Sequence, residues 1–103
     1  MSKQLDFMFR LYIAGDTQNS MQALVNLTHF CQTYLADLYT IEVLDVFKEQ
    51  SRALQDSVFM TPTLIKMTPE PVIKIVGTLS QTDILLQTLG LSDFMYDSNR
   101  FKK

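Results

Sequence analysis

A strand, a helix and a second strand follow one another in the N-terminal half, and this order constrains the fold more than any other feature of the sequence. Residues 5–13, LDFMFRLYI, alternate between apolar and more polar side chains, which predicts a β-strand with one strongly apolar face. After a turn, Asn19 or Ser20 can cap a helix that runs to about Ala36. Residues 39–46, YTIEVLDV, indicate a second strand that can lie parallel to the first through a right-handed crossover. The pattern predicts a βαβ unit.

The helix of this unit contains the only cysteine and the only histidine of the chain. Its predicted apolar stripe consists of Met21, Leu24, Val25, Thr28, Cys31 and Leu35. On this stripe Cys31 is expected to be a buried and inert thiol, and one cysteine excludes an internal disulfide framework. His29 has no cysteine or acidic cluster near it in the sequence, so we expect a surface or partly packed residue rather than a metal ligand or base.

The C-terminal half predicts a short helix, a hairpin and a last helix. Residues 48–56, KEQSRALQD, are polar helix formers with few apolar positions, so a helix there is short and lightly buried. TLIKM and VIKIV predict two strands, and the TPEP segment between them favours a hairpin. Ser80 can cap a helix through Leu89, with Gly90 as its left-handed stop. The expected order is β-α-β-α-β-β-α, an α/β fold.

Composition excludes several classes of function. The chain has 103 residues and is 47% hydrophobic, which fits a single domain over residues 1–91 with residues 92–103, SDFMYDSNRFKK, as a C-terminal tail. A net charge of -2 argues against nucleic acid or anionic membrane as a partner. The sequence shows no secretory leader and no membrane-spanning run, so a cytoplasmic protein is expected. Since it also shows no phosphate-binding glycine loop, carboxylate pair or metal-ligand spacing, we expect no cofactor, no metal and no enzymatic activity.

A proline at the mouth of a predicted strand points to a fold family. Proline cannot donate a hydrogen bond to a sheet, so Pro62 in Thr61-Pro62-Thr63 belongs at a strand start, an edge or a bulge. The element order and this step resemble the thioredoxin fold, in which a cis-proline precedes the third strand. The resemblance puts Thr17 and Ser20 where that family carries its two redox cysteines. Hydroxyl groups cannot replace a reactive thiolate and a resolving thiol, so disulfide exchange is not expected at this turn.

Three longer stretches of the sequence are LYIAGDTQNS, EVLDVFKEQSRALQD and MTPTLIKMTPEPVIKIVGTLS. They resemble segments of the KaiB family, a thioredoxin-like family without the cysteine pair, and the resemblance spans roughly residues 7–91. Gln18 and Glu70 stand where the family often has proline, and Thr78 stands where aspartate is common, which suggests a divergent member.

The resemblance implies two folds for one sequence. One is a thioredoxin-like monomer that binds the KaiC ATPase ring, with Pro62 in the cis form. The other is a ground state that assembles as a tetramer, with a rearranged C-terminal half in the order β-α-β-β-α-α-β and with Pro62 in the trans form. A few kcal/mol would suffice to exchange the two packings. The residues implied in the exchange are Pro62, Pro69, Pro71, Gly77 and Thr78.

The same resemblance implies a non-enzymatic adaptor of a circadian clock or timing system. It would bind a KaiC-type ATPase, modulate its phosphorylation state and capture a KaiA-type activator, and it would exchange between monomer and a dimer or tetramer. The implied partner-binding residues are Asp45, Lys48, Lys66 and Lys74, although lone charges at strand ends are usually only solvated. Met8, Arg10 and Tyr12 share one face of the first strand and could be covered by another subunit. The alternative function is a redox-inactive thioredoxin-like module that acts in stress response or holds unfolded clients.

Overall fold

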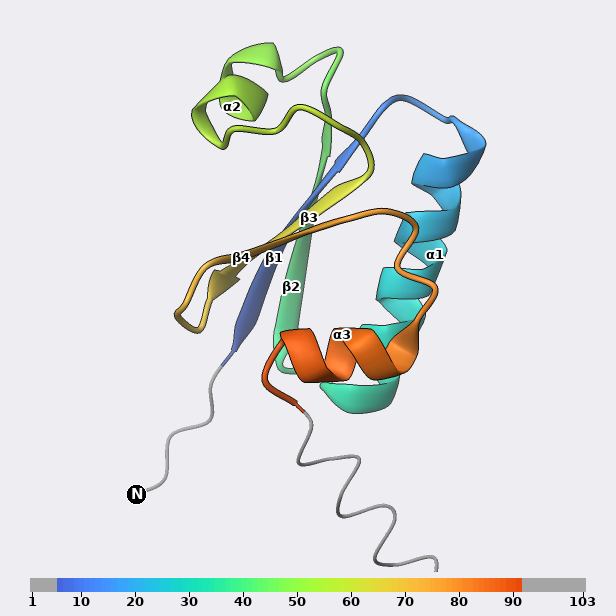
Figure 1. The fold of residues 1–103 in the computed structure, drawn as a ribbon, viewed down its shortest axis with the longest axis vertical. Helices are drawn as coiled ribbons and strands as arrows, with labels where there is room; N and C mark the ends of the chain where they lie inside the picture. The colour runs from blue at the N-terminus through green and yellow to red at the C-terminus, as the bar shows by residue number, and fades with distance from the viewer. Residues whose placement is uncertain (1–5, 92–103) are drawn as a thin grey trace, which may run out of the picture.

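A computed structural model describes residues 6–91, which form a four-stranded sheet with three helices (Figure 1). The elements in chain order are β1 (Phe7–Ile13), α1 (Gln18–Tyr34), β2 (Tyr39–Asp45), α2 (Gln50–Gln55), β3 (Thr63–Thr68), β4 (Ile73–Val76) and α3 (Thr82–Thr88). This order confirms the predicted β-α-β-α-β-β-α arrangement. The predicted start of the first strand at Leu5 and the predicted tail at residues 92–103 lie outside the described residues.

The sheet has the strand order β2-β1-β3-β4. β1 runs parallel to β2, and the register pairs Phe9 with Ile41. β3 lies antiparallel to β1 on its other side, where Leu11 faces Leu64. β3 and β4 form an antiparallel hairpin, which pairs Ile65 with Lys74. Both the predicted βαβ unit and the predicted hairpin are therefore confirmed.

Helices cover both faces of the sheet, so the central strands are buried on two sides. α1 and α3 cover one face (Figure 1), and Phe9, Leu11 and Leu64 pack there against apolar side chains of both helices. α2 covers the other face, where Tyr12 and Ile65 form a smaller apolar cluster. The alternation of β1 explains the first cluster, because its predicted apolar face is the one that α1 covers.

The buried stripe of α1 differs in part from the prediction. The buried residues of the helix are Ser20, Ala23, Leu27, Phe30 and Cys31. Met21 and Leu24 are only partly buried, and Val25 is 62% exposed, so its predicted place on the stripe is wrong. At 100° per residue, Val25 points about 200° away from Leu27, and only one of these two positions can face the sheet.

Two predicted helix caps are also wrong. α1 begins at Gln18 after Thr17, and no side chain caps its first turn. Instead of capping the helix, Ser20 accepts a hydrogen bond at its Oγ from the backbone N–H of Ala14 (3.0 Å). α3 begins at Thr82, two residues after Ser80, and again no side chain caps it. Packing of the helices on the sheet compensates for the missing caps.

The ends of the C-terminal elements agree with the predicted stop signals. Gly90 has a φ of +78° and its N–H donates to the carbonyl of Gln87, as expected for a left-handed helix stop. Gly77 has a φ of +125° and follows β4 directly. The peptide bonds before Pro62, Pro69 and Pro71 are cis. α2 spans six residues and buries only Ala53, in agreement with a short and lightly buried helix.

Candidate partner-binding surface

A network of hydrogen bonds attaches the end of α2 to the sheet. The guanidinium of Arg10 donates to both carboxylate oxygens of Asp56, at 3.3 and 3.0 Å. The hydroxyl of Tyr12 donates to the same carboxylate at 2.6 Å. Arg10 and Tyr12 lie on β1, whereas Asp56 follows α2, so the network joins residues more than 40 positions apart in the sequence. It holds a helix that buries little apolar surface of its own.

A second set of contacts extends the network to β2. Arg52 of α2 donates to both carboxylate oxygens of Glu42, at 2.6 and 2.9 Å. Glu42 also lies 3.4 Å from Nε of Arg10. The hydrogen bonds from Arg52 hold the pKa of Glu42 below its usual value. Since Glu42 and Arg52 are both partly exposed to solvent, we assign this outer pair a role in orientation rather than in stability.

The inner carboxylate predicts how stability depends on pH. Burial raises the pKa of Asp56, but the hydrogen bonds from Tyr12 and Arg10 outweigh burial and leave the pKa below its usual value. Burial and the hydrogen bond to Asp56 raise the pKa of Tyr12 to about 12. The stabilisation by Asp56 is thus fully present above the unfolded carboxyl pKa of about 3.9 and is lost as pH falls through the folded pKa.

We therefore expect Asp56→Asn to lower the free energy of unfolding by about 1–3 kcal/mol at pH 7 and by less near pH 3, where the carboxylate begins to be protonated. Urea titrations at both pH values measure this difference. Asp37→Asn is the matched control, because Asp37 is exposed and its side chain has no hydrogen-bond partner within residues 6–91. Equal losses for Asp56→Asn at the two pH values would contradict the role assigned to the ionised carboxylate.

Large apolar side chains surround α2 without being covered. Phe47 is 66% exposed, Leu54 70%, Phe59 81% and Met60 64%. We call these four residues the α2 apolar patch. Phe47, Phe59 and Met60 line an open pocket of about 250 Å³, which Ala14 and Ala53 also line. Exposed apolar groups of this size that lie around a pocket are typical of a protein-binding surface.

Three of the four predicted partner-binding residues lie on this side of the sheet. Asp45 ends β2, and its Oδ1 accepts hydrogen bonds from the backbone N–H groups of Phe47 (2.9 Å) and Gly15 (3.3 Å). Lys48 is exposed one residue after Phe47. Lys74 reaches across from β4 and donates to the carbonyl of Ser57 at 3.3 Å. These charges border the α2 apolar patch.

The fourth residue, Lys66, lies on the other face of the sheet. Its side chain is on the face that α1 and α3 cover, and the residue is only 3% exposed. Lys74 pairs with Ile65, one position away from Lys66, and neighbouring positions of a strand point to opposite faces. The structure therefore separates Lys66 from the other three predicted partner-binding residues.

The predicted self-association residues differ in their exposure to solvent. Met8 is 49% exposed, and the side chain of Arg10 is 30% exposed. Tyr12 is completely buried in the cluster under α2. In this fold α2 of the same chain, not a second subunit, covers Tyr12.

The turn after β1 carries hydroxyls in place of a redox pair. The hydroxyl of Thr17 donates to Oγ of Ser20 at 2.8 Å, and Ser20 is completely buried. The only thiol, Cys31, is also completely buried on α1, and burial raises its pKa to about 12. A thiolate is therefore almost absent from the folded protein near neutral pH.

Alkylation of Cys31 tests this arrangement. At pH 8 we expect iodoacetamide to modify the folded protein at least about a thousandfold more slowly than the urea-unfolded protein, because the thiolate fraction is small and the sulfur is covered. Mass spectrometry over time gives both rates. Comparable rates in the two states would mean that the thiol is accessible and not inert.

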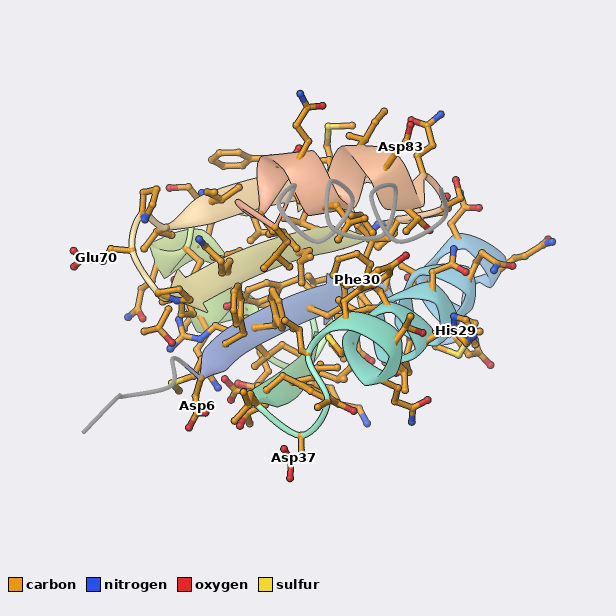
Figure 2. The ribbon with its side chains drawn as sticks, turned by 90° about the horizontal axis from the view of Figure 1, so that it is seen from below. Asp6, His29, Phe30, Asp37, Glu70 and Asp83 are labelled. Carbon is orange, nitrogen blue, oxygen red and sulfur yellow. The ribbon has the colours of Figure 1, made fainter. Side chains whose placement is uncertain are left out.

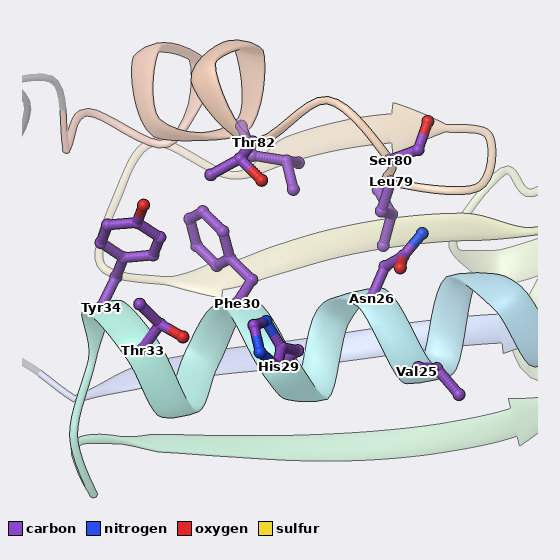
Figure 3. Close-up of a pocket in the computed structure, with 10 residues that line it drawn as sticks. Val25, Asn26, His29, Phe30, Thr33, Tyr34, Leu79, Ser80 and Thr82 are labelled. Carbon is purple, nitrogen blue, oxygen red and sulfur yellow. The ribbon is translucent and has the colours of Figure 1, made fainter.

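A shallow pocket of about 220 Å³ lies between α1 and the segment that leads into α3 (Figure 3). Asn26 projects from α1 toward Leu79 and Ser80 in this view, and its Nδ2 donates to the carbonyl of Thr78 at 2.8 Å. His29 also lines the pocket but is exposed at the outer side of α1, whereas Phe30 lies between α1 and α3 (Figure 2). The hydrogen bond from Asn26 holds the loop at Thr78, a residue implied in the fold exchange.

Acidic and metal-binding groups do not gather at any of these places. Asp6, Asp37, Glu70 and Asp83 lie apart at the periphery (Figure 2). Residues 6–91 contain no cluster of three or more His, Cys, Asp or Glu side chains that could hold a metal ion. Within the same range no helix is both long and apolar enough to cross a membrane.

Sequence reasoning missed the two parts of the surface that the structure makes prominent. The partnership of Arg10, Tyr12 and Asp56 joins distant segments and leaves no local pattern. Phe47 and Phe59 did carry a signal, because each flanks the polar 48–56 segment as an isolated aromatic residue. An aromatic residue beside a helix too polar to cover it is a candidate for exposure.

Comparison with known proteins gives one family and one fold. Residues 10–91 match the KaiB domain. The circadian clock oscillator protein KaiB of Prochlorococcus marinus is 39% identical over 105 residues, which cover 95% of this chain and 90% of that protein. The circadian clock protein KaiB3 of Synechocystis is 43% identical over 82 residues, which cover 80% of this chain and 78% of that protein.

Solved structures with the same fold include a thioredoxin and the N-terminal domain of SasA. The N-terminal domain of Synechococcus elongatus SasA superposes with a TM-score of 0.67 at 14% identity and covers 94% of this chain and 90% of that domain. Saccharomyces cerevisiae mitochondrial thioredoxin 3 gives 0.65 at 23% identity, over 88% of this chain and 81% of that protein. At these identities the likeness shows a thioredoxin-like fold and nothing about activity. The domain match and the identities to curated relatives show that the chain belongs to the KaiB family.

Proposed function

We propose that this protein is a non-enzymatic adaptor of a bacterial timing system, which binds a KaiC-type ATPase ring and modulates its phosphorylation state. Its relatives are named circadian clock proteins, which supports a role in clock regulation. The observation that carries the proposal is the α2 apolar patch, which two aromatic side chains dominate and which Asp45, Lys48 and Lys74 border. An apolar centre with a charged rim is the usual anatomy of a protein interface.

The exposed aromatic area at this surface favours a protein partner over a small ligand. Phe47 and Phe59 expose most of their rings to water, and covering aromatic area of this kind is a main source of binding free energy. The pocket between them is open and shallow, so it suits an inserted side chain of a partner. The bordering charges would orient the partner, and reversal of one of them would chiefly change the association rate.

We also propose that binding is gated by a slow exchange between two packings of the C-terminal half. This half leaves Phe59, Met60, Val72, Val76 and Ile84 about half exposed or more, and α2 buries only one residue. A packing with so much uncovered apolar surface has little advantage over an alternative that covers it in an oligomer. If the binding-competent fold is scarce, the apparent affinity falls by its population. We assign self-association through Met8 and Arg10, as a tetramer or dimer, to the alternative packing.

The decisive experiment measures the mass of the complex. Light scattering of the protein with a purified KaiC-type ATPase is expected to show an ATP-dependent assembly much larger than either component, and addition of a KaiA-type activator is expected to enlarge it. A pull-down from cell extract distinguishes the alternative, because a client-holding module would capture many unfolded proteins without nucleotide dependence. No ring in either experiment would overturn the proposal.

The slow exchange between the two packings can be tested separately from ring binding. With the ATPase in excess, the observed association rate is expected to reach a plateau set by the exchange rather than to rise with concentration. A second set of amide peaks from residues 60–80 in NMR spectra of the free protein would report the other packing. A rate that rises linearly to the highest concentration, with one set of peaks, would remove gating but leave ring binding in place.

A further inference from the structure

A buried lysine, Lys66, lines a cavity at the other end of the molecule from the α2 apolar patch. Lys66 is 3% exposed, and it lies on β3 between the buried Ile65 and the partly buried Met67. Its Nζ lies 5.9 Å from the centroid of the Phe7 ring, a cation–π contact. Burial lowers the pKa of this ammonium group. A charge removed from water to this extent normally has an ionic or hydrogen-bonding partner.

Residues 6–91 supply no such partner. The ion pairs within this range join Arg10, Arg52, Glu42 and Asp56, and the side-chain hydrogen bonds do not include Lys66. Glu70 borders the same cavity but is exposed and points outward (Figure 2).

The cavity around Lys66 has a volume of about 460 Å³ and a mainly apolar lining. The lining consists of Phe7, Lys66, Pro69, Glu70, Pro71, Ile73, Gln87, Thr88, Leu89, Gly90 and Leu91. Lys66 is one of the residues that line this cavity, and its ammonium nitrogen is not among the side-chain nitrogens that are both sealed from solvent and unpaired within the described residues. An apolar space of several hundred cubic ångströms with one oriented polar group is typical of a small-molecule site.

We propose that this cavity binds a small organic anion with one carboxylate and an apolar body, and that Lys66 pairs with the carboxylate. The carboxylate supplies the counter-charge that a buried ammonium lacks, and a charge-assisted hydrogen bond is stronger away from water. Phe7, the two prolines and Leu89 then contact the apolar body. Because Lys66 lies on the face that α1 and α3 cover, such a ligand would stabilise the docking of α3 on the hairpin. The proposal does not depend on KaiC binding.

Octanoate and octanol are suitable probes, because they share an apolar chain and differ in charge. By NMR titration of the full chain, we expect octanoate to bind saturably and to shift amide peaks of Phe7, Leu89 and Leu91. Octanol is expected to bind at least about tenfold more weakly. The ¹³Cε signal of Lys66 gives a second readout, since binding of an anion should raise the lowered pKa of its ammonium.

Lys66→Met is expected to weaken octanoate binding at least about tenfold and to leave octanol binding unchanged. Lys74→Met is the matched control, because Lys74 is an exposed lysine on the same hairpin. If Lys66→Met does not fold, Ile73→Trp should fill the cavity and abolish binding of both probes. Equal octanoate affinity in wild type and Lys66→Met, or no saturable shift, would overturn the proposal. A rise in octanoate affinity in Asp93→Asn or Asp97→Asn would also overturn it, because the chain's own carboxylate would then be the partner of Lys66.

Discussion

Replacing Phe47 and Phe59 together by serine is expected to weaken binding to a KaiC-type ATPase by at least about a hundredfold. The two rings are 66% and 81% exposed in the free protein, so their contacts in the fold are few. The free energy of unfolding should therefore stay within about 0.5 kcal/mol of the wild-type value. Titration calorimetry with the ATP-bound ring and urea unfolding of the free protein give the two quantities.

Val25→Ser is the matched control for this pair. Val25 is 62% exposed but lies on α1, which covers the opposite face of the sheet. We expect no change in affinity for this variant. If it weakened binding as much as the double variant, or if the double variant bound normally, the α2 apolar patch would not be the binding surface.

Leu64→Ala is expected to lower the free energy of unfolding by about 3 kcal/mol. Leu64 is 1% exposed and lies on β3 opposite Leu11, in the core between the sheet and the helices α1 and α3. Truncation removes buried apolar surface and leaves a cavity, because the neighbouring side chains relax only in part. Urea unfolding followed by circular dichroism measures the loss.

Leu54→Ala provides the comparison for the same chemical change at the surface. Leu54 is 70% exposed on α2, so its truncation should change stability by no more than about 0.5 kcal/mol. If Leu64→Ala lowered the free energy of unfolding by well under 1 kcal/mol, the fold described here would not be the dominant state of the free protein. It would indicate a packing in which β3 does not lie in the core, as the proposed exchange allows.

Local patterns in the sequence predicted the elements correctly wherever they were strong. The alternation of β1, the long helix after it and the strand-like runs of the hairpin all specify local backbone geometry, which neighbouring residues decide among themselves. The stop at Gly90 was predictable for the same reason, because a left-handed residue favours glycine. The errors concern side-chain roles: Ser20 and Ser80 were interpreted as caps, and Val25 was assigned to the buried stripe.

The candidate surfaces depend on contacts between residues that are far apart in the sequence, and local patterns do not encode such contacts. Asp56 accepts a hydrogen bond from Tyr12, which lies 44 positions earlier in the sequence, and this contact exists only when α2 docks on the sheet. Docking of α2 also buries Tyr12 and leaves Phe47 and Phe59 uncovered, although all three are aromatic residues. Exposure is a property of the assembled layers, so sequence reasoning could name candidates for it but could not select among them.

By itself, the sequence determined the order of the elements, the parallel βαβ unit, the hairpin and the absence of a thiol pair at the β1–α1 turn. Only the tertiary structure decided that Lys66 and Lys74, two lysines of one hairpin, face opposite sides of the sheet. The physical reason is the two-residue period of a strand: a difference of one position in the pairing register decides whether a lysine faces the core or the partner surface.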